Sequence, residues 1–279
     1  MKIVKVGIIG YGKMGQIYSK EIKKLKKFKV ENILRHKNIL KNPKAIDNFF
    51  NSKKIDLFII SSPIKTHFKY LKHAFKANKD IIVEKPLVEN ENQLKKLINL
   101  NKKFKKKIMI HHNDVINFEK MKFRDNLGDL KIIKKIQMTY GKKEIVNSYK
   151  KPFLDWLPHP LSVIINFLGK PDNVKIIDYS KNIKNKLTIE NLRIVLYLKS
   201  LPIFLKFSNN LKIASKKIIV YKNNKVKTYN GYNKLSRRSI KFLLEKFYNT
   251  TKINEVDTNQ DVYKLLFRID KQIDKFNKT

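Results

Sequence analysis

The chain has 279 residues, enough for two domains with substantial cores, and 42% of its residues are hydrophobic, which argues against disorder. No stretch approaches the roughly 20 apolar residues that span a bilayer. The sequence has no cysteine, which excludes disulfides, thiolate metal sites and a cysteine nucleophile and fits a reducing cytosol. We expect no signal peptide, because the first predicted strand begins at residue 3. We therefore expect a cytoplasmic protein without a membrane segment.

The formal net charge of +40 is a signal associated with nucleic-acid binding. The excess is nearly all lysine, spread over the whole chain, whereas arginine, which makes bidentate contacts with phosphate and guanine, is rare. Abundant Asn and Ile accompany the lysines, and all three share A/T-rich codons, so genome composition explains them economically. A nucleic-acid partner is therefore a minor alternative, and the charge is expected to assist an anionic ligand.

An apolar strand predicted over residues 4–9 runs into closely spaced glycines that fit the pattern G-x-G-x-x-G. The first glycine of this pattern permits a tight turn, the second lets the backbone approach a pyrophosphate, and the third lets helix and strand pack closely. A helix is predicted to follow through about residue 26, and its N-terminus favours phosphate. The predicted cofactor contacts in this turn are Gly10, Gly12, Lys13, Met14 and Gly15.

The residues after the second predicted strand, 30–34, indicate which dinucleotide is bound. In an NAD-binding unit an acidic residue about 20 positions beyond the last glycine bonds the ribose 2′-hydroxyl. The corresponding position here is Arg35, followed by His36 and Lys37. Cations suit a 2′-phosphate, so NADP is the expected cofactor, with NAD as the alternative. The competing interpretation is a group of ordinary surface cations, and no metal site is expected.

Strands and helices alternate throughout residues 2–111. Further strands are predicted over 56–60, 81–83 and 107–110, and helices over 43–51, 67–77 and 91–104. This alternation predicts an α/β fold, a doubly wound parallel Rossmann sheet, with residues 1–111 as a dinucleotide-binding domain. Ligands bind beyond the carboxyl ends of such strands, so the glycine turn, residues 61–63 and residues 84–86 should share one rim.

From residue 112 strands dominate, which predicts an α+β domain over 112–279 with a largely antiparallel open sheet. The strands are predicted over 132–140, 174–179, 192–198, 203–207, 217–220 and 225–228, and the helices over 158–168, 236–248 and 260 to the end. Turns at 199–202 and 223–224 should join neighbouring strands as hairpins. The one-sided sheet predicts a substrate-binding and oligomerisation domain, in a homodimer or homotetramer.

Four segments occur in order along the chain: GIIGYGKMG, SSPIKTHF, NKDIIVEKPL and DWLPHPLSVIINFLGKP. Together they resemble the Gfo/Idh/MocA oxidoreductases (glucose–fructose oxidoreductase, inositol dehydrogenase and relatives), and E-K-P is the most specific of the signals. The resemblance implies NAD(P)-dependent hydride transfer to or from a hydroxyl or ketone carbon of a sugar, nucleotide sugar or cyclitol. The alternatives are a non-catalytic NAD(P)-binding sensor of the same fold and a basic nucleic-acid-binding protein.

The resemblance also implies roles for individual residues. Lys85 matches the family lysine that hydrogen-bonds the reacting oxygen, while Asp155 and His159 match a D-x-x-x-H pattern whose histidine exchanges the proton. General chemistry agrees, because histidine titrates near neutrality and a lysine stabilises a developing alkoxide. Asp155 is expected to orient the imidazole or to bind a substrate hydroxyl. The additional expected cofactor contacts are Ser61, Ser62, Pro63, His67, Glu84 and Lys85.

Two further features of the sequence bear on the pocket. His111 and His112 are candidates for substrate-pocket residues, because they follow the last parallel strand. Pro158 stands where the family usually has a glycine before its histidine, which puts the shape of the pocket, and with it the substrate, in doubt. Each site residue also has a structural interpretation, with Lys85 as a surface charge and His159 as a helix-start residue.

Overall fold

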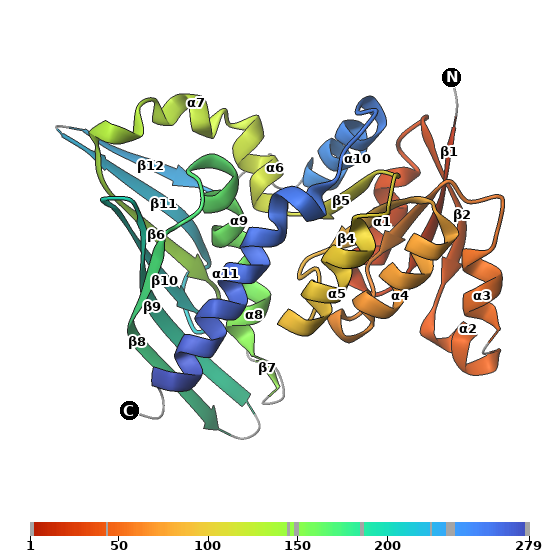
Figure 1. Ribbon diagram of the computed structural model, residues 1–279, viewed down its shortest axis with the longest axis horizontal. Helices are drawn as coiled ribbons and strands as arrows, with labels where there is room; N and C mark the ends of the chain where they lie inside the picture. Colours follow the sequence, from red (N-terminus) through yellow and green to blue (C-terminus); the bar gives the residue numbers. More distant parts are fainter. Residues whose placement is uncertain are drawn as a thin grey trace. The chain divides into compact units, whose positions relative to one another are not determined.

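The computed structural model describes residues 3–42, 44–143, 146–147, 151–184, 187–223, 225–232 and 238–276 (Figure 1). The chain divides into two compact units. The first contains Met1–His111 and Arg238–Gln260, and the second contains His112–Arg237 and Asp261–Thr279. The sequence-based division assigned everything after residue 111 to the second domain, whereas in the structure residues 238–260 pack with the first unit.

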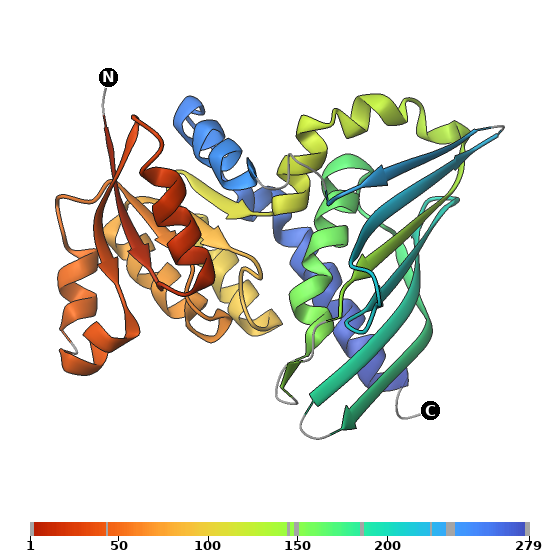
Figure 2. The same ribbon diagram turned by 180° about the vertical axis from the view of Figure 1, so that it is seen from behind.

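The first unit is built on a five-stranded parallel sheet of order β2-β1-β3-β4-β5, as the alternating pattern predicted. Its strands are β1 (Val4–Ile9), β2 (Phe28–Leu34), β3 (Leu57–Ile60), β4 (Asp80–Glu84) and β5 (Ile108–His111). Its helices are α1 (Lys13–Ile22), α2 (His36–Lys41), α3 (Ala45–Phe50), α4 (Ile64–Ala77), α5 (Glu91–Asn101) and α10 (Ser239–Asn249). Helices α4 and α5 lie on one face of the sheet in Figure 1, and α1 and α10 lie on the other in Figure 2. Both faces are therefore covered, which explains why β3 and β4 are almost continuously apolar.

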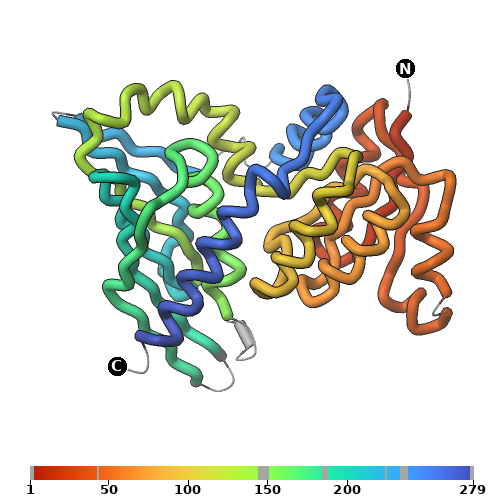
Figure 3. Tube along the Cα trace, viewed as in Figure 1, coloured from red at the N-terminus to blue at the C-terminus, as the bar shows by residue number. Residues whose placement is uncertain are grey.

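The C-terminal segment returns to the last strand of this sheet, as the tube in Figure 3 shows. The backbone N–H of Ile108 donates to the carbonyl of Ile253 at 2.9 Å, and that of Ile110 donates to the Glu255 carboxylate at 2.7 Å. The Asn101 side chain donates to Asp257 at 2.8 Å. These contacts tie together residues more than 140 positions apart, a pairing that no local pattern in the sequence encodes.

The second unit contains a seven-stranded sheet. Its strands are β6 (Ile133–Gly141), β7 (Val146–Asn147), β8 (Asn173–Lys184), β9 (Leu187–Leu198), β10 (Leu201–Ser208), β11 (Ser215–Lys222) and β12 (Val226–Asn230). The order is β12-β11-β6-β10-β9-β7, with β8 also paired to β9. Every pair is antiparallel except β10 with β6, so the prediction of a largely antiparallel sheet is confirmed. The predicted hairpins β9–β10 and β11–β12 are also present.

Helices cover one face of this sheet in both views (Figures 1 and 2). They are α6 (Asn113–Lys120), α7 (Phe123–Leu127), α8 (Pro152–Trp156), α9 (Pro158–Phe167) and the C-terminal part of α11 (Glu255–Phe276). Helices α6 and α7 were not predicted, because their short segments lack a clear apolar period. Helix α9 begins on Pro158, whose missing N–H costs nothing in a first helical turn. In the described part of the chain, no helix is both long and apolar enough to cross a membrane.

Candidate functional site

The glycine turn between β1 and α1 has the geometry that its sequence predicts. Gly10 has φ +88°, and a β-carbon there would lie 2.6 Å from the backbone of Ser62. A β-carbon on Gly15 would lie 2.1 Å from the carbonyl oxygen of Gly10. Both glycines are therefore required by close backbone packing inside the first unit.

Gly12 differs from these two, because its β-carbon would meet no protein atom within 4 Å. It is the N-cap residue of α1, where no side chain caps the helix. Packing of the described residues therefore gives no reason for glycine at this position, whereas close approach of a ligand phosphate to the backbone does. The turn fits the pyrophosphate of a dinucleotide.

Arg35 lies at the end of β2, next to the glycine turn. Its guanidinium carbon lies 4.2 Å from the centre of the Tyr11 ring, a cation–π contact that holds the half-buried side chain beside the turn. His36 begins α2 and is exposed. Lys13 is exposed and Met14 half-buried in the first turn of α1. The cations expected to contact the cofactor thus lie at the carboxyl end of the sheet.

The end of β3 forms the neighbouring part of the rim. The Ser61 hydroxyl lies 3.0 Å from the Gly10 carbonyl oxygen, to which it donates. The Ser62 hydroxyl accepts a hydrogen bond from Thr66 at 2.8 Å, and Pro63 is exposed as the N-cap residue of α4. The hydroxyl of Ser61 is therefore committed to holding the glycine turn, while Ser62 and Pro63 lie further out.

His67 connects this turn to the loop that carries Lys85. Its Nε2 lies 2.8 Å from the carbonyl oxygen of Ser62, and its Nδ1 lies 2.9 Å from that of Pro86. The ring is 1% exposed, and burial lowers its pKa despite the two carbonyls and the nearby Glu84. The neutral ring donates to one of the two carbonyls. His67 thus fixes two stretches of the rim to each other.

Glu84, at the end of β4, is buried in a polar cluster. Its carboxylate accepts from the Tyr18 hydroxyl at 3.0 Å and from His111 Nδ1 at 2.6 Å. Burial raises the pKa of Glu84, but His111 and Lys85 outweigh that effect and hold it below the usual value. Burial and the charge of Glu84 raise the pKa of Tyr18 well above its usual range. The cluster anchors the strand end from which half-buried Lys85 follows.

The histidines at the end of β5 are both buried, and their expected place in a substrate pocket stays a prediction. His111 is 3% exposed and bonded to Glu84, and His112 is 3% exposed with its Nε2 3.3 Å from the Tyr263 hydroxyl. The His111 ring is hydrogen-bonded inside the first unit, and the His112 ring is in contact with Tyr263 inside the second. Across the described ranges, no group of three or more His, Asp or Glu residues could hold a metal ion.

In the second unit, α8 and α9 carry the D-x-x-x-H pattern. The backbone N–H of Phe153 donates to the buried Glu190 carboxylate at 2.9 Å, which fixes the first turn of α8. Asp155 is exposed on this helix, and its predicted role stays a prediction. His159 lies in the first turn of α9 and is 9% exposed.

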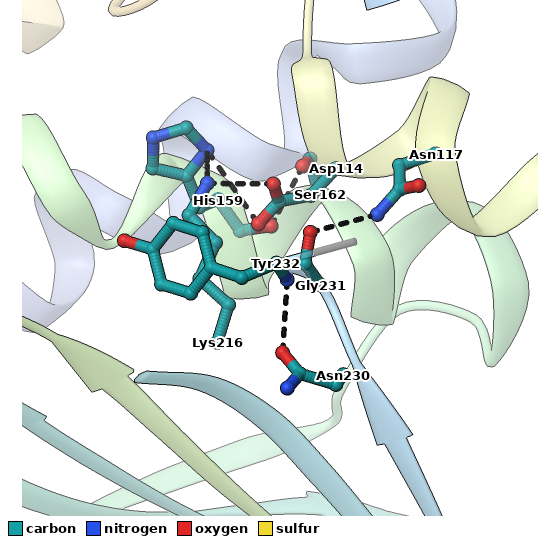
Figure 4. A network of polar contacts seen from close by, with 8 residues as sticks. All are labelled: Asp114, Asn117, His159, Ser162, Lys216, Asn230, Gly231 and Tyr232. Atoms are coloured by element: carbon teal, nitrogen blue, oxygen red, sulfur yellow. Dashed lines mark hydrogen bonds and ion pairs between the residues drawn. The ribbon is translucent and has the colours of Figure 1, made fainter. Parts of the chain in front are cut away.

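His159 belongs to a polar cluster that the sequence reasoning missed (Figure 4). Nζ of Lys216, on β11, lies 2.7 Å from Oδ1 of Asp114 on α6 and 3.4 Å from Nδ1 of His159. Oδ2 of Asp114 lies 3.6 Å from the same nitrogen. The lysine nitrogen also faces the Trp156 and Tyr232 rings, at 6.0 and 5.6 Å from their centres. Asp114 is thus a carboxylate that the structure places near the His159 ring.

A signal for Lys216 was present in the sequence. Ile218 and Val220 are buried on β11, and Lys216 has the same parity, so the two-residue period of a strand turns it to the same face. A lysine on the inner face of a sheet is rarely buried without a partner. No comparable local pattern identifies Asp114, because α6 itself was not predicted.

Comparison with known proteins agrees with this geometry. Residues 4–112 match the family model of the oxidoreductases with an NAD-binding Rossmann fold, GFO_IDH_MocA. The chain is 28% identical over 122 residues to an uncharacterised oxidoreductase, YdgJ, from Escherichia coli strain K12. That match covers 39% of this chain and 34% of the relative, so it spans about a third of the relative's length.

Solved structures share the fold over nearly the whole chain. Biliverdin reductase from Synechocystis sp. PCC 6803, in complex with biliverdin and NADP+, has a TM-score of 0.71 at 14% identity, over 95% of this chain and 97% of that one. UDP-N-acetylglucosamine 3-dehydrogenase from Acidithiobacillus ferrooxidans has a TM-score of 0.74 at 13% identity, over 96% and 97%. The dehydrogenase MviM from Clostridium difficile has a TM-score of 0.74 at 16% identity, over 97% and 100%. These likenesses concern the fold.

Proposed function

We propose that the chain is an NADP-dependent oxidoreductase of the Gfo/Idh/MocA family, because residues 4–112 match the model of that family. It transfers a hydride between nicotinamide and a hydroxyl or ketone carbon of a sugar, nucleotide sugar or cyclitol. The observation that carries the proposal is the rim of the first unit, where Gly12 leaves room for a phosphate and His67 ties the Ser62 turn to the Lys85 loop.

Residues of the first unit hold the cofactor in this proposal. The backbone at Gly12 and the first turn of α1 receive the pyrophosphate, and Arg35 pairs with the 2′-phosphate of NADP. Ser62, Pro63 and His67 lie on the nicotinamide side. When bound, the nicotinamide ring supplies or accepts the hydride. The anchored loop at Glu84 holds Lys85, whose ammonium polarises the reacting oxygen and stabilises developing negative charge.

His159 carries the proton chemistry. A hydroxyl oxidised to a ketone loses a proton from oxygen, and a ketone that is reduced gains one, so a residue that titrates near neutrality is required. Asp155, exposed four residues earlier, binds a substrate hydroxyl. The substrate range draws support from the dehydrogenase of a nucleotide sugar that shares the fold.

We further propose a cytoplasmic homodimer or homotetramer. The cysteine-free sequence suits a reducing compartment. Exposed apolar side chains on the sheet of the second unit support association: Ile177 on β8, Tyr197 on β9 and Phe204 on β10 are 47%, 37% and 41% exposed. Burying them against a second copy would remove apolar surface from water.

The test is a titration of the purified chain with NADPH and NADH, followed by a substrate screen. NADPH should bind more tightly, and at least one sugar, nucleotide sugar or cyclitol should change the nicotinamide absorbance. Equal affinity for both cofactors would contradict the role of Arg35. Tight NADPH binding with no turnover across the screen would instead favour the sensor. Salt-sensitive binding of random duplex DNA at an affinity rivalling that for NADPH would favour a nucleic-acid binder.

A further inference from the structure

We propose that Lys216 is a positioning residue for His159: its ammonium donates a hydrogen bond to Nδ1, so that the neutral ring carries its proton on Nε2. This inference rests on the proposed function only for its catalytic meaning, since the contacts themselves lie within the second unit. It assigns a role to a lysine that the sequence pattern of the site does not include.

The geometry places two competing partners at one nitrogen (Figure 4). Nζ of Lys216 is within hydrogen-bond distance of Nδ1, at 3.4 Å, whereas Oδ2 of Asp114 is 3.6 Å away. The Lys216 side chain is 6% exposed and that of Asp114 is 1% exposed, so water does not replace either partner. Both members of this buried ion pair therefore face Nδ1 of His159.

The two partners make opposite demands on Nδ1. An ammonium has donors and no lone pair, so a ring nitrogen facing it must accept. A carboxylate only accepts, so the same nitrogen facing it must donate. Oδ1 of Asp114 is bonded to Lys216 at 2.7 Å, while Oδ2 lies 3.6 Å from Nδ1, beyond hydrogen-bond distance. The contact of Nδ1 within hydrogen-bond distance is the one to the ammonium, and on that geometry we infer that Lys216 decides the tautomer.

The groups around Lys216 and Asp114 do not change which of the two determines the tautomer of His159. Burial and the Asp114 charge raise the pKa of Tyr140 on β6 well above its usual range, so its hydroxyl stays neutral. Trp156 on α8 and Tyr232 present aromatic rings to the lysine nitrogen, which stabilise an ammonium. On α9, Ser162 donates to the backbone carbonyl of His159 at 2.8 Å and so leaves the ring alone. Every described contact thus keeps Lys216 charged beside Nδ1.

The tautomer has a chemical consequence. With its proton on Nε2, the neutral ring offers a donor at the nitrogen that does not face Lys216. A donor suits the oxygen of a ketone, which has lone pairs and no proton. When Nε2 gives its proton to that oxygen during reduction, Nδ1 takes one from the Lys216 ammonium and the ring stays neutral, and oxidation of the hydroxyl reverses both transfers. The cluster therefore prepares His159 to receive the ketone form of the substrate, through a hydrogen bond that Lys216 directs without touching the substrate.

The alternative is that Lys216 and Asp114 form an ion pair that only ties β11 to α6. The two interpretations differ in what the ring does when the lysine is removed. Without the ammonium, the Asp114 carboxylate still faces Nδ1 as an acceptor, and the proton should move from Nε2 to Nδ1. A purely structural pair predicts no such change in a variant that folds.

The experiment is a ¹⁵N–¹H correlation spectrum of the histidine-labelled full chain, at a pH where the ring is neutral. His159→Gln assigns the His159 signals. In the wild type, Nδ1 should show the shift of an unprotonated nitrogen and Nε2 that of a protonated one. Lys216→Met should reverse the two, Lys216→Arg should restore the wild-type pattern, and Asp114→Asn should retain it. Lys217→Met, an exposed neighbour on the opposite face of β11, is the matched control.

A proton on Nδ1 in the wild type would overturn the proposal, and so would an unchanged tautomer in folded Lys216→Met. If Lys216→Met does not fold, the wild-type and Asp114→Asn spectra still decide between the outcomes. The spectra require neither cofactor nor substrate. Failure of the proposed function would appear as absent turnover, whereas failure of this inference would appear as the wrong tautomer.

Discussion

Nζ of Lys216 lies 2.7 Å from Oδ1 of Asp114, and the two side chains are 6% and 1% exposed. A buried pair of this kind is costly to break, because the charge that remains has neither water nor a partner. Replacing both members by apolar residues of similar size often costs little. The pair should therefore show strong energetic coupling in the second unit.

Asp114→Ala is expected to lower the free energy of unfolding by about 3–5 kcal/mol, because it leaves the Lys216 ammonium buried and unpaired. The double variant Asp114→Leu with Lys216→Met should recover most of that loss. Urea unfolding of the wild type, Asp114→Leu, Lys216→Met and the variant that combines these two substitutions measures the coupling. Additive losses would show that the two side chains do not act as a pair.

Gly15 and Gly12 should respond differently to alanine. A β-carbon at Gly15 meets the Gly10 carbonyl oxygen at 2.1 Å, so Gly15→Ala should destabilise the chain by about 1–3 kcal/mol. Gly12→Ala meets no protein atom and should leave the melting temperature unchanged while weakening NADPH binding. Thermal unfolding and a cofactor titration on both variants separate the effects. Undiminished NADPH affinity in Gly12→Ala would argue against a phosphate at this turn.

The buried ring of His67 predicts a pH dependence of stability. Burial lowers its pKa in the folded state, so the unfolded chain binds the proton more readily. The stability contributed by the neutral ring is present above the unfolded pKa of about 6.5 and is lost as the pH falls through the folded value. Glu84, whose pKa is also lowered from 4.5, loses its contribution only at more acidic pH.

His67→Leu should therefore melt lower than the wild type at neutral pH and lose less stability on acidification towards pH ~5.5. Leaving the one carbonyl, of Ser62 or Pro86, that accepts from the ring without its donor should cost about 1–3 kcal/mol. Melting temperatures at the two pH values measure both effects. His36→Leu, at an exposed histidine at the start of α2, is the control. An equal acid-induced loss in His67→Leu and the wild type would remove His67 as the source.

Arg35 is expected to set the choice of cofactor. Arg35→Ala should weaken NADPH binding by at least ~10-fold, because a charge-assisted hydrogen bond contributes about 1.5–3 kcal/mol, and should change NADH binding little. Lys29→Ala removes an exposed cation from the same strand and should affect neither cofactor selectively. Calorimetric titration of the two variants with both cofactors measures the difference. A parallel loss for NADPH in both variants would mean that general positive charge, rather than Arg35, attracts the phosphate.

The sequence allowed the parallel sheet, the glycine turn and most strands of the second sheet to be predicted, because each has a local signal. Gly10 and Gly15 occur where only glycine fits, and alternation on β11 follows the two-residue period. The return of residues 238–260 to β5 could not be predicted, since it depends on pairing between distant residues. Asp114 escaped notice for the same reason, because its partner Lys216 lies 102 positions away.

The candidate site residues could be predicted only in part from the sequence. Lys85 was found through its E-K-P context, and the structure adds that the preceding Glu84 is held by Tyr18 and His111. The sequence did not reveal that His111 and His112 are buried and hydrogen-bonded, because a histidine at a strand end can face a ligand or complete a buried hydrogen-bond network. Residue type alone does not separate these cases; burial and partners do.

The most direct test of the proposed reaction is NADPH-dependent turnover by the wild type and by Lys85→Met, with Lys65→Met, at an exposed lysine of α4, as the control. On a substrate from the screen, the wild type and the control should consume NADPH at similar rates. Lys85→Met should bind NADPH normally and lose turnover by at least ~100-fold, the scale of losing one group that stabilises transition-state charge. Turnover in Lys85→Met at the rate of the wild type would contradict the proposed chemistry.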